Sequence, residues 1–146
     1  MTIQIAPLHA KDRAGWNALA RGYKAFYETP TTDAEYDRAW LRLLTGERVH
    51  GLGASLDGKL VGITHYFFHT SVWTDRVCYL QDLFVDETVR GRGVARALIE
   101  AVATEARAQQ AARLYWMTRE SNHTARALYD KLAKFNGFIR YEYPMA

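Results

Sequence analysis

The sequence has few of the residues that mark several common classes of protein. Its 146 residues include one cysteine, Cys78, and three prolines. A single cysteine excludes both an internal disulfide framework and a cysteine-based zinc site. No apolar run approaches the ~20 residues that a membrane-spanning helix needs, and residues 1–13 lack the apolar stretch of a signal peptide. The sequence therefore predicts a cytoplasmic protein with no membrane partner.

The charges are nearly balanced. Nineteen Lys and Arg residues stand against sixteen Asp and Glu residues, which leaves a formal net charge of +3. This mild excess suits an anionic ligand and does not require nucleic acid as a partner. With 49% apolar residues, a chain of this length buries roughly two-thirds of its unfolded surface. We predict a single domain over residues 1–146 and no nucleic-acid partner.

The first third of the chain is predicted to form a strand followed by two helices. A short alternating strand covers residues 2–6, and apolar side chains then recur at helical spacing from about residue 11 to residue 28. Thr32 stands where it would cap a second helix, and Gly46 stands where that helix would end.

Strands dominate the pattern after residue 48. Strands at 49–56 and 59–69 are joined by the Asp57-Gly58 turn, and residues 76–85 are apolar on both faces, as a central strand would be. A helix at about 91–110, a strand at 113–118, a helix at 122–134 and a last strand at 137–143 follow. Strand, helix and strand imply a right-handed parallel crossover. We expect an α+β fold with a mixed, mostly antiparallel sheet, a central parallel pair and helices on both faces.

One loop has the features of an anion site. The run Arg90-Gly91-Arg92-Gly93-Val94-Ala95 falls where a buried strand gives way to a helix. The first turn of a helix leaves backbone N–H groups unpaired and carries partial positive charge, and glycine lets a phosphate approach those amides. Arg90, Arg92 and Arg96 add positive charge. The loop therefore predicts a diphosphate site.

Other interpretations of this loop are weaker or remain open. The dinucleotide pattern fails because Arg96 stands at its third glycine position, and the P-loop ending Gly-Lys-Ser/Thr is missing. The loop could still be a tight turn whose arginines face solvent. An Arg-Gly segment that binds RNA is a further alternative. The Arg-Gly run occurs only once, however, and a helix with an apolar face follows it.

Two motifs in order resemble those of the GNAT superfamily of N-acetyltransferases. Arg90-x-x-Gly93-x-Ala95 is similar to the signature after the fourth strand of that family. Asn122-x-x-Ala125-x-x-x-Tyr129, followed by Gly137-Phe138, resembles its later motif. Residues 79–85 and 115–122 resemble more narrowly the branch with diamine and histone acetyltransferases.

The resemblance implies acetyl-CoA as the acyl donor. Its pyrophosphate would bind the loop amides, its pantetheine arm would follow the strand before the loop, and the later motif would contact that arm. No metal is implied, and His65 and His69 lie about 13 Å apart on an extended strand, too far for one ion. The residues implied in acetyl-CoA binding are Leu83, Phe84, Val85, Arg90, Gly91, Arg92, Gly93, Val94, Ala95, Arg96, Asn122 and Ala125.

Tyr129 and Asp82 are the catalytic candidates. The resemblance implies that Tyr129 protonates the departing CoA thiolate, whereas its spacing alone would make it part of an inward helical stripe. Diamine-acetylating relatives often carry Glu where this chain has Gln81, so Asp82 is the nearest carboxylate for a base. Asp82 could equally be a hydrogen-bonded structural acid.

Tyr27, Glu28 and Gln81 are the candidate acceptor-binding residues. Aromatic faces beside acidic groups suit a cationic amine, so a small amine, for example a polyamine, is the expected acceptor. Lysine or the N-terminus of a protein is the alternative acceptor. A non-catalytic acyl-CoA-binding module and a nucleic-acid-binding domain are the alternatives from other classes. The terminal Tyr141-Glu-Tyr143 run predicts a homodimer.

Overall fold

The computed structural model describes residues 2–146. The described residues divide into two compact units, 2–116 and 117–146. The single domain predicted for residues 1–146 stays a prediction.

The first unit is built on a five-stranded sheet in the order β1-β2-β3-β4-β5. All neighbours are antiparallel except the parallel pair β4 and β5. The middle strand is therefore β3, and the parallel pair lies at one edge of the sheet. The prediction of a central parallel pair is wrong in this respect. The strands are β1 (Ile3–Pro7), β2 (His50–Leu56), β3 (Lys59–His69), β4 (Val77–Val85) and β5 (Leu114–Tyr115).

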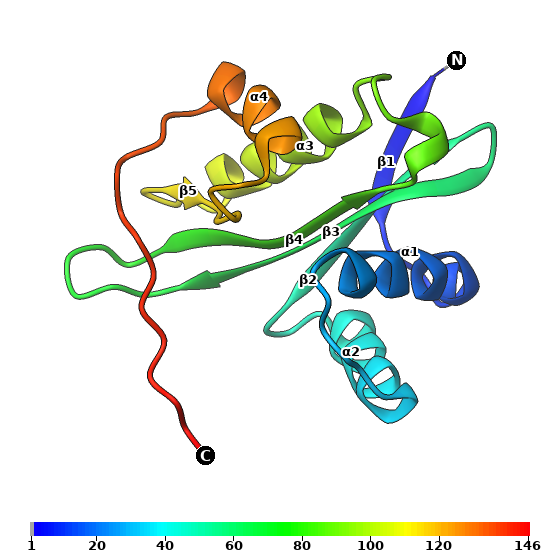
Figure 1. The fold of residues 1–146 in the computed structure, drawn as a ribbon, viewed down its shortest axis with the longest axis horizontal. Helices are drawn as coiled ribbons and strands as arrows, with labels where there is room; N and C mark the ends of the chain where they lie inside the picture. The colour runs from blue at the N-terminus through cyan, green and yellow to red at the C-terminus, as the bar shows by residue number, and fades with distance from the viewer. Residues whose placement is uncertain (1) are drawn as a thin grey trace. The chain divides into compact units, whose positions relative to one another are not determined.

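Helices cover both faces of this sheet. α1 (Arg13–Phe26) and α2 (Asp33–Thr45) lie on one face, and α3 (Val94–Ala108) lies on the other (Figure 1). Short 3₁₀ turns, Ala10–Asp12 and Glu87–Val89, precede α1 and follow β4. The side chain of Thr32 accepts a hydrogen bond from the Glu35 amide at 3.2 Å, and Gly46 ends α2 in the left-handed region. These caps confirm the predicted ends of α2.

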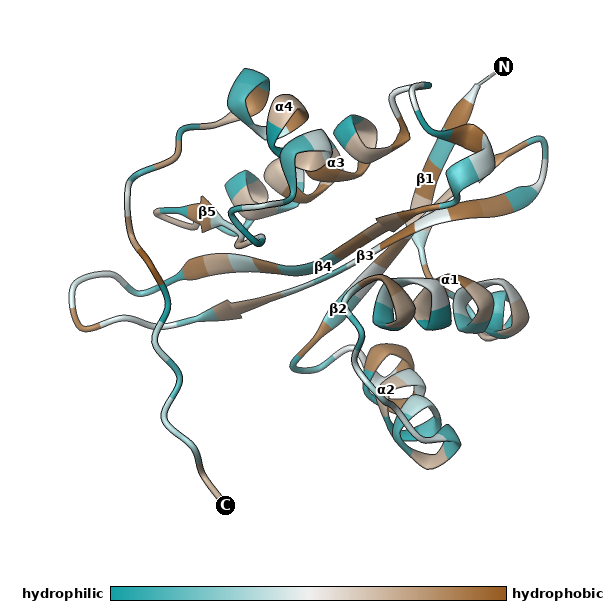
Figure 2. Cartoon of the chain, in the orientation of Figure 1, coloured by the Kyte–Doolittle hydropathy of each residue, from teal (hydrophilic) through white to brown (hydrophobic). Residues whose placement is uncertain are grey.

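Two apolar clusters hold the layers together, and hydrophobic residues gather along the strands between the helices (Figure 2). Trp16 and Trp40 belong to the cluster between the sheet and the helices α1 and α2. Val94 and Leu98 belong to the cluster that packs α3 onto the other face. Gly62 permits this approach of α3, because a Cβ there would lie 3.0 Å from Val94 and 3.1 Å from Leu98. Cys78 is fully buried in this core.

The second unit holds one helix, α4 (His123–Leu132), and no strand among its residues. The strand predicted at 137–143 is therefore wrong, and the one predicted at 113–118 is reduced to Leu114 and Tyr115. Alternation makes such segments able to pair, but a strand forms only where a neighbour supplies main-chain partners. Phe138 and Tyr141 stay 82% and 88% exposed. None of the helices in residues 2–146 is long and apolar enough to cross a bilayer.

Candidate functional site

The loop between β4 and α3 opens onto the first turn of that helix. Gly91 and Gly93 have φ values of +81° and +84°, and a Cβ at either would meet no atom within 4 Å. The Ala97 amide donates to the Gly93 carbonyl at 3.0 Å, so the amides of residues 94–96 precede the helical ladder. Positive φ, open space and amides outside the helical ladder are the features that an anion site at a helix start needs. The helix begins at Val94, slightly later than predicted, which leaves both glycines in the loop.

Arg90 and Arg96 are exposed and weakly held. Arg90 lies 3.8 Å from Glu87, and its guanidinium stands 5.9 Å from the ring centre of Phe84. Arg96 pairs with Glu100 at 2.9 Å. Exposed pairs of this kind contribute at most about 1 kcal/mol, so a multiply charged anion would compete well for both side chains.

The edge of β4 next to β5 is open along most of its length. Only Cys78 and Tyr79 pair with β5, opposite Leu114 and Tyr115. The main-chain groups that β4 presents on this side from Leu80 to Val85 are therefore not bonded to β5. A ligand with amides could bind there like an added strand that leads to the loop. Residues 83–85, which the sequence predicts to bind the pantetheine arm of acetyl-CoA, all lie on this open stretch of β4.

A β-bulge separates Leu80 from Asp82. Tyr66 of β3 pairs with Leu80, and the preceding His65 pairs with Asp82, so Gln81 is an extra residue on β4. Leu80 and Asp82 would share a face of a regular strand. The bulge reverses that alternation and turns Asp82 towards α1.

Asp82 is the centre of a hydrogen-bonded group of polar side chains. Its Oδ2 lies 2.8 Å from Nδ1 of His65, whose Nε2 accepts a hydrogen bond from Nε1 of Trp16 at 2.9 Å. The Tyr23 hydroxyl hydrogen-bonds the same carboxylate. Burial acts to raise the pKa of Asp82, but the hydrogen bonds from His65 and Tyr23 and the charge of Lys24 outweigh it, so this pKa lies below its ordinary value. Asp82 is therefore ionised at neutral pH.

Tyr23 is the neutral donor of this group. Burial raises its pKa, and the nearby carboxylate of Asp82 raises it further. Its hydroxyl therefore keeps its proton at neutral pH.

Two of the three predicted acceptor residues, Tyr27 and Glu28, follow the end of α1, and the third, Gln81, lies at the bulge of β4. The rings of Tyr23 and Tyr27 lie 5.0 Å apart, and Glu28 has a left-handed backbone with φ of +53°. The acidic residues that begin α2 have other partners: Asp33 pairs with Arg21, and Asp37 pairs with Arg13, each at 2.6 Å. Asp33 and Asp37 are occupied by these ion pairs between α1 and α2. Glu28 is therefore a better candidate than either of them for contact with a cationic acceptor.

The later motif belongs to the second unit. Asn122 stands at the N-cap position of α4, but its side chain makes no cap and donates to Thr118 at 3.0 Å. Ala125 and Tyr129 lie on the same helix. The contact of Asn122 and Ala125 with the coenzyme arm and the role of Tyr129 as general acid stay predictions.

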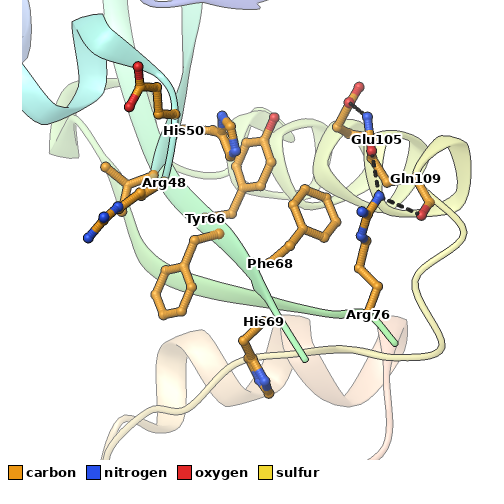
Figure 3. Close-up of a pocket in the computed structure, with 11 residues that line it drawn as sticks. Arg48, His50, Tyr66, Phe68, His69, Arg76, Glu105 and Gln109 are labelled. Atoms are coloured by element: carbon orange, nitrogen blue, oxygen red, sulfur yellow. Dashed lines mark hydrogen bonds between the residues drawn. The ribbon is translucent and has the colours of Figure 1, made fainter. Parts of the chain in front are cut away.

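A separate cavity of about 600 Å³ lies on the α3 side of the sheet (Figure 3). Tyr66, Phe68 and His50 line it with Arg76, which donates to the side chain of Gln109 at 2.8 Å. None of these residues belongs to the loop or to the group around Asp82, so this cavity is distinct from the predicted site.

Sequence reasoning missed two members of the Asp82 group. Trp16 and His65 are 49 residues apart, and neither lies in a recognisable motif. Their role depends on the register of β3 with β4, which no local signal fixes.

Comparison with known proteins identifies the family. Residues 16–135 match the Acetyltransferase (GNAT) family. The chain belongs to the GNAT family. It is therefore an acyltransferase of the N-acetyltransferase class. The GNAT fold expected from the loop motifs is confirmed.

Two kinds of relative agree with this assignment. A D-amino-acid N-acetyltransferase of Saccharomyces cerevisiae is 32% identical over 135 residues, which are 90% of this chain and 84% of the relative. A thialysine N-epsilon-acetyltransferase of Caenorhabditis elegans is 29% identical over 93 residues, which are 64% of this chain and 58% of the relative.

Solved structures share the GNAT fold. A ribosomal-protein-alanine N-acetyltransferase from Brucella melitensis has a TM-score of 0.82 with 25% identity over 99% of this chain and 100% of its own. An aminoglycoside N-acetyltransferase in complex with CoA has a TM-score of 0.86 with 17% identity, covering 99% of this chain and 96% of its own.

Proposed function

We propose that this protein transfers an acetyl group from acetyl-CoA to the primary amine of a small cationic acceptor. The loop at the start of α3 carries the proposal, because its glycines leave open space beside orphan amides and arginines. The relatives named above act on a D-amino acid and on thialysine, and both of these carry amines. A structure of similar fold was solved with CoA.

The diphosphate of CoA would be bound by the amides of residues 91–96 and by Arg90, Arg92 and Arg96. Its amide-bearing arm would add to the open edge of β4 at Leu83, Phe84 and Val85. Asn122 and Ala125 would contact the same arm from α4. This placement would bring the thioester, which supplies the acetyl group, close to the bulge at Gln81.

The reaction would be a direct attack within a ternary complex. The amine nitrogen forms a bond to the acetyl carbon while the bond from that carbon to sulfur breaks. An ammonium has an ordinary pKa near ~10.4 and no lone pair, so a neutral amine must attack. Its N–H becomes strongly acidic as the new bond forms, and Asp82 would then receive that proton directly or through water. Tyr129 would give its proton to the departing thiolate.

The acceptor would lie between α1 and the sheet. Tyr27 offers an aromatic face, Glu28 offers a carboxylate, and Gln81 offers an amide at the bulge. These groups suit a compact cation. The ionised Asp82 would hold the ammonium until the ammonium releases its first proton to solvent water and becomes the neutral amine that attacks.

A protein acceptor is a second candidate. The similarity to a ribosomal-protein-alanine N-acetyltransferase at 25% identity favours an N-terminal amine as the alternative. A non-catalytic module would also keep the loop, but it would bind CoA without turnover.

A homodimer is part of the proposal. Phe138, Tyr141 and Tyr143 are each more than 80% exposed in a segment that has no strand partner in residues 2–146. A second copy could cover these side chains. Light scattering after size exclusion would give twice the monomer mass if this is correct.

An amine panel with acetyl-CoA would test the function by following released thiol. It should include polyamines, D-amino acids, thialysine, a lysine peptide and a peptide with N-terminal alanine. We expect the highest kcat/KM with a small cationic amine. A higher kcat/KM with a peptide than with any small amine would favour protein acetylation as the function. CoA binding without turnover of any amine would contradict catalysis.

A further inference from the structure

The proposed function uses Asp82 but leaves its neighbours unexplained. Trp16 on α1, His65 on β3 and Asp82 on β4 form a continuous series of hydrogen bonds. The two heavy-atom distances, 2.9 Å and 2.8 Å, are those of well-formed bonds. The three residues come from three different elements of the first unit.

The chemistry of Trp16 fixes the proton of His65. An indole N–H only donates, so Nε2 of His65 must offer a lone pair. The proton of the neutral ring is then on Nδ1, the atom that faces Asp82. While the indole stays in place, His65 donates to Asp82 and has no room for a second proton on Nε2.

Packing keeps this arrangement rigid. The Trp16 side chain is 1% exposed, and its ring lies 5.0 Å from that of Trp40 and 6.4 Å from that of Tyr36. The direction of the indole N–H is therefore set by the core. Thr64, which is fully buried, donates from Oγ1 to the main-chain carbonyl of Asp82 at 2.8 Å. Asp82 is thus fixed through both its main chain and its side chain.

The carboxylate nevertheless remains accessible. The side chain of Asp82 is 22% exposed, while that of His65 is 13% exposed. Two donors, His65 and Tyr23, face it, and Lys24 of α1 is the charged group nearby. Buried carboxylates are costly, and apolar side chains of similar volume would fill the same space without that cost. A fixed and partly open anion is suited to receive a cation.

We infer that Trp16 and His65 are positioning residues of the acceptor site. The indole holds His65 in the tautomer that donates from Nδ1, and His65 in turn fixes Asp82 as an oriented anion for the amine. This inference rests on the proposed function, because it assigns these residues to amine acetylation.

Paired substitutions at His65 separate this role from simple packing. Asparagine places an amide N–H near the position of Nδ1, so His65→Asn retains the donor, whereas His65→Leu removes it. We expect His65→Leu to lower kcat/KM for the best amine by about 10- to 100-fold, as expected for a lost hydrogen bond to a charge. His65→Asn should stay within about threefold of wild type, and the Kd for CoA should be unchanged in both variants.

His69→Leu is the matched control. His69 lies on the same strand, but it contacts Tyr115 and not Asp82. Its variant should keep wild-type kcat/KM. Equal losses in His65→Leu and His65→Asn, or wild-type activity in His65→Leu, would overturn the inference. Melting temperatures of all variants would show whether a loss follows from unfolding.

A spectroscopic measurement tests the tautomer without any turnover. In ¹⁵N NMR of histidine-labelled protein, His65 should show a protonated Nδ1 and an unprotonated Nε2 at pH 7. Trp16→Phe keeps a ring but removes the N–H, so the signals should shift towards a mixture of tautomers. A wild-type His65 protonated on Nε2 would overturn the inference. Failure of the whole amine panel would contradict the proposed function instead, and the two failures are therefore distinguishable.

Discussion

Replacement of Gly93 by alanine tests the anion site most directly. Gly93 has φ of +84°, a left-handed conformation that costs an L-residue about 1–2 kcal/mol. Unfolding entropy is about 2.1 cal/mol/K per residue, which for this length makes 1 kcal/mol equal to roughly 3 °C. Gly93→Ala should therefore lower the melting temperature by roughly 3–7 °C.

The same change should also weaken CoA binding. The new methyl group would occupy open space beside the first amides of α3, where the diphosphate is proposed to lie. A lost hydrogen bond to a charged group costs about 1.5–3 kcal/mol. We therefore expect the Kd for CoA, measured by calorimetry, to rise about 10- to 100-fold.

Gly58→Ala provides the control. Gly58 has φ of +80° in the turn between β2 and β3, and a Cβ there also meets nothing within 4 Å. Its variant should lose similar stability and keep the wild-type Kd. If Gly93→Ala loses stability but binds CoA as tightly as wild type, the diphosphate does not lie on this loop.

Three further predictions concern single side chains. Tyr129→Phe should slow acetyl transfer by about 100-fold with little change in the Kd for CoA, and unchanged turnover would remove Tyr129 from the mechanism. Because the folded pKa of Asp82 lies below its ordinary value, its ionisation stabilises the fold above about pH 4, and this stabilisation is lost in more acidic solution. In urea unfolding, the free energy of unfolding of Asp82→Asn should therefore decrease less below pH 4 than that of wild type. Burial and the charge of Glu105 raise the pKa of Cys78 to about 11, so wild-type stability should fall by about 1–2 kcal/mol between pH 9 and pH 11, and an equal fall in Cys78→Ala would contradict this.

Local chemistry explains why much of the fold could be predicted. The cap of Thr32, the left-handed Gly46 and the Asp57-Gly58 turn each act on groups within a few residues. The loop at Gly93 belongs to the same class, because its open amides follow from the start of a helix. These signals need no partner from elsewhere in the chain.

Strands at the end of the chain could not be predicted in the same way. Residues 137–143 alternate as a strand does, yet they have no regular structure, and β5 contains only Leu114 and Tyr115. Alternation describes a surface that is able to pair. Whether pairing occurs depends on a main-chain edge supplied by a distant segment.

The sequence by itself determined the glycine loop before α3, the helix ends and the hairpin turn, because the deciding atoms are close neighbours along the chain. Only the tertiary structure decided what Asp82 contacts. The bulge at Gln81 turns its carboxylate towards α1. His65, 17 residues away in the sequence, contacts that carboxylate, and Trp16 in turn donates a hydrogen bond to His65. Strand register and core packing set these contacts, and both arise from non-local interactions across the whole sheet.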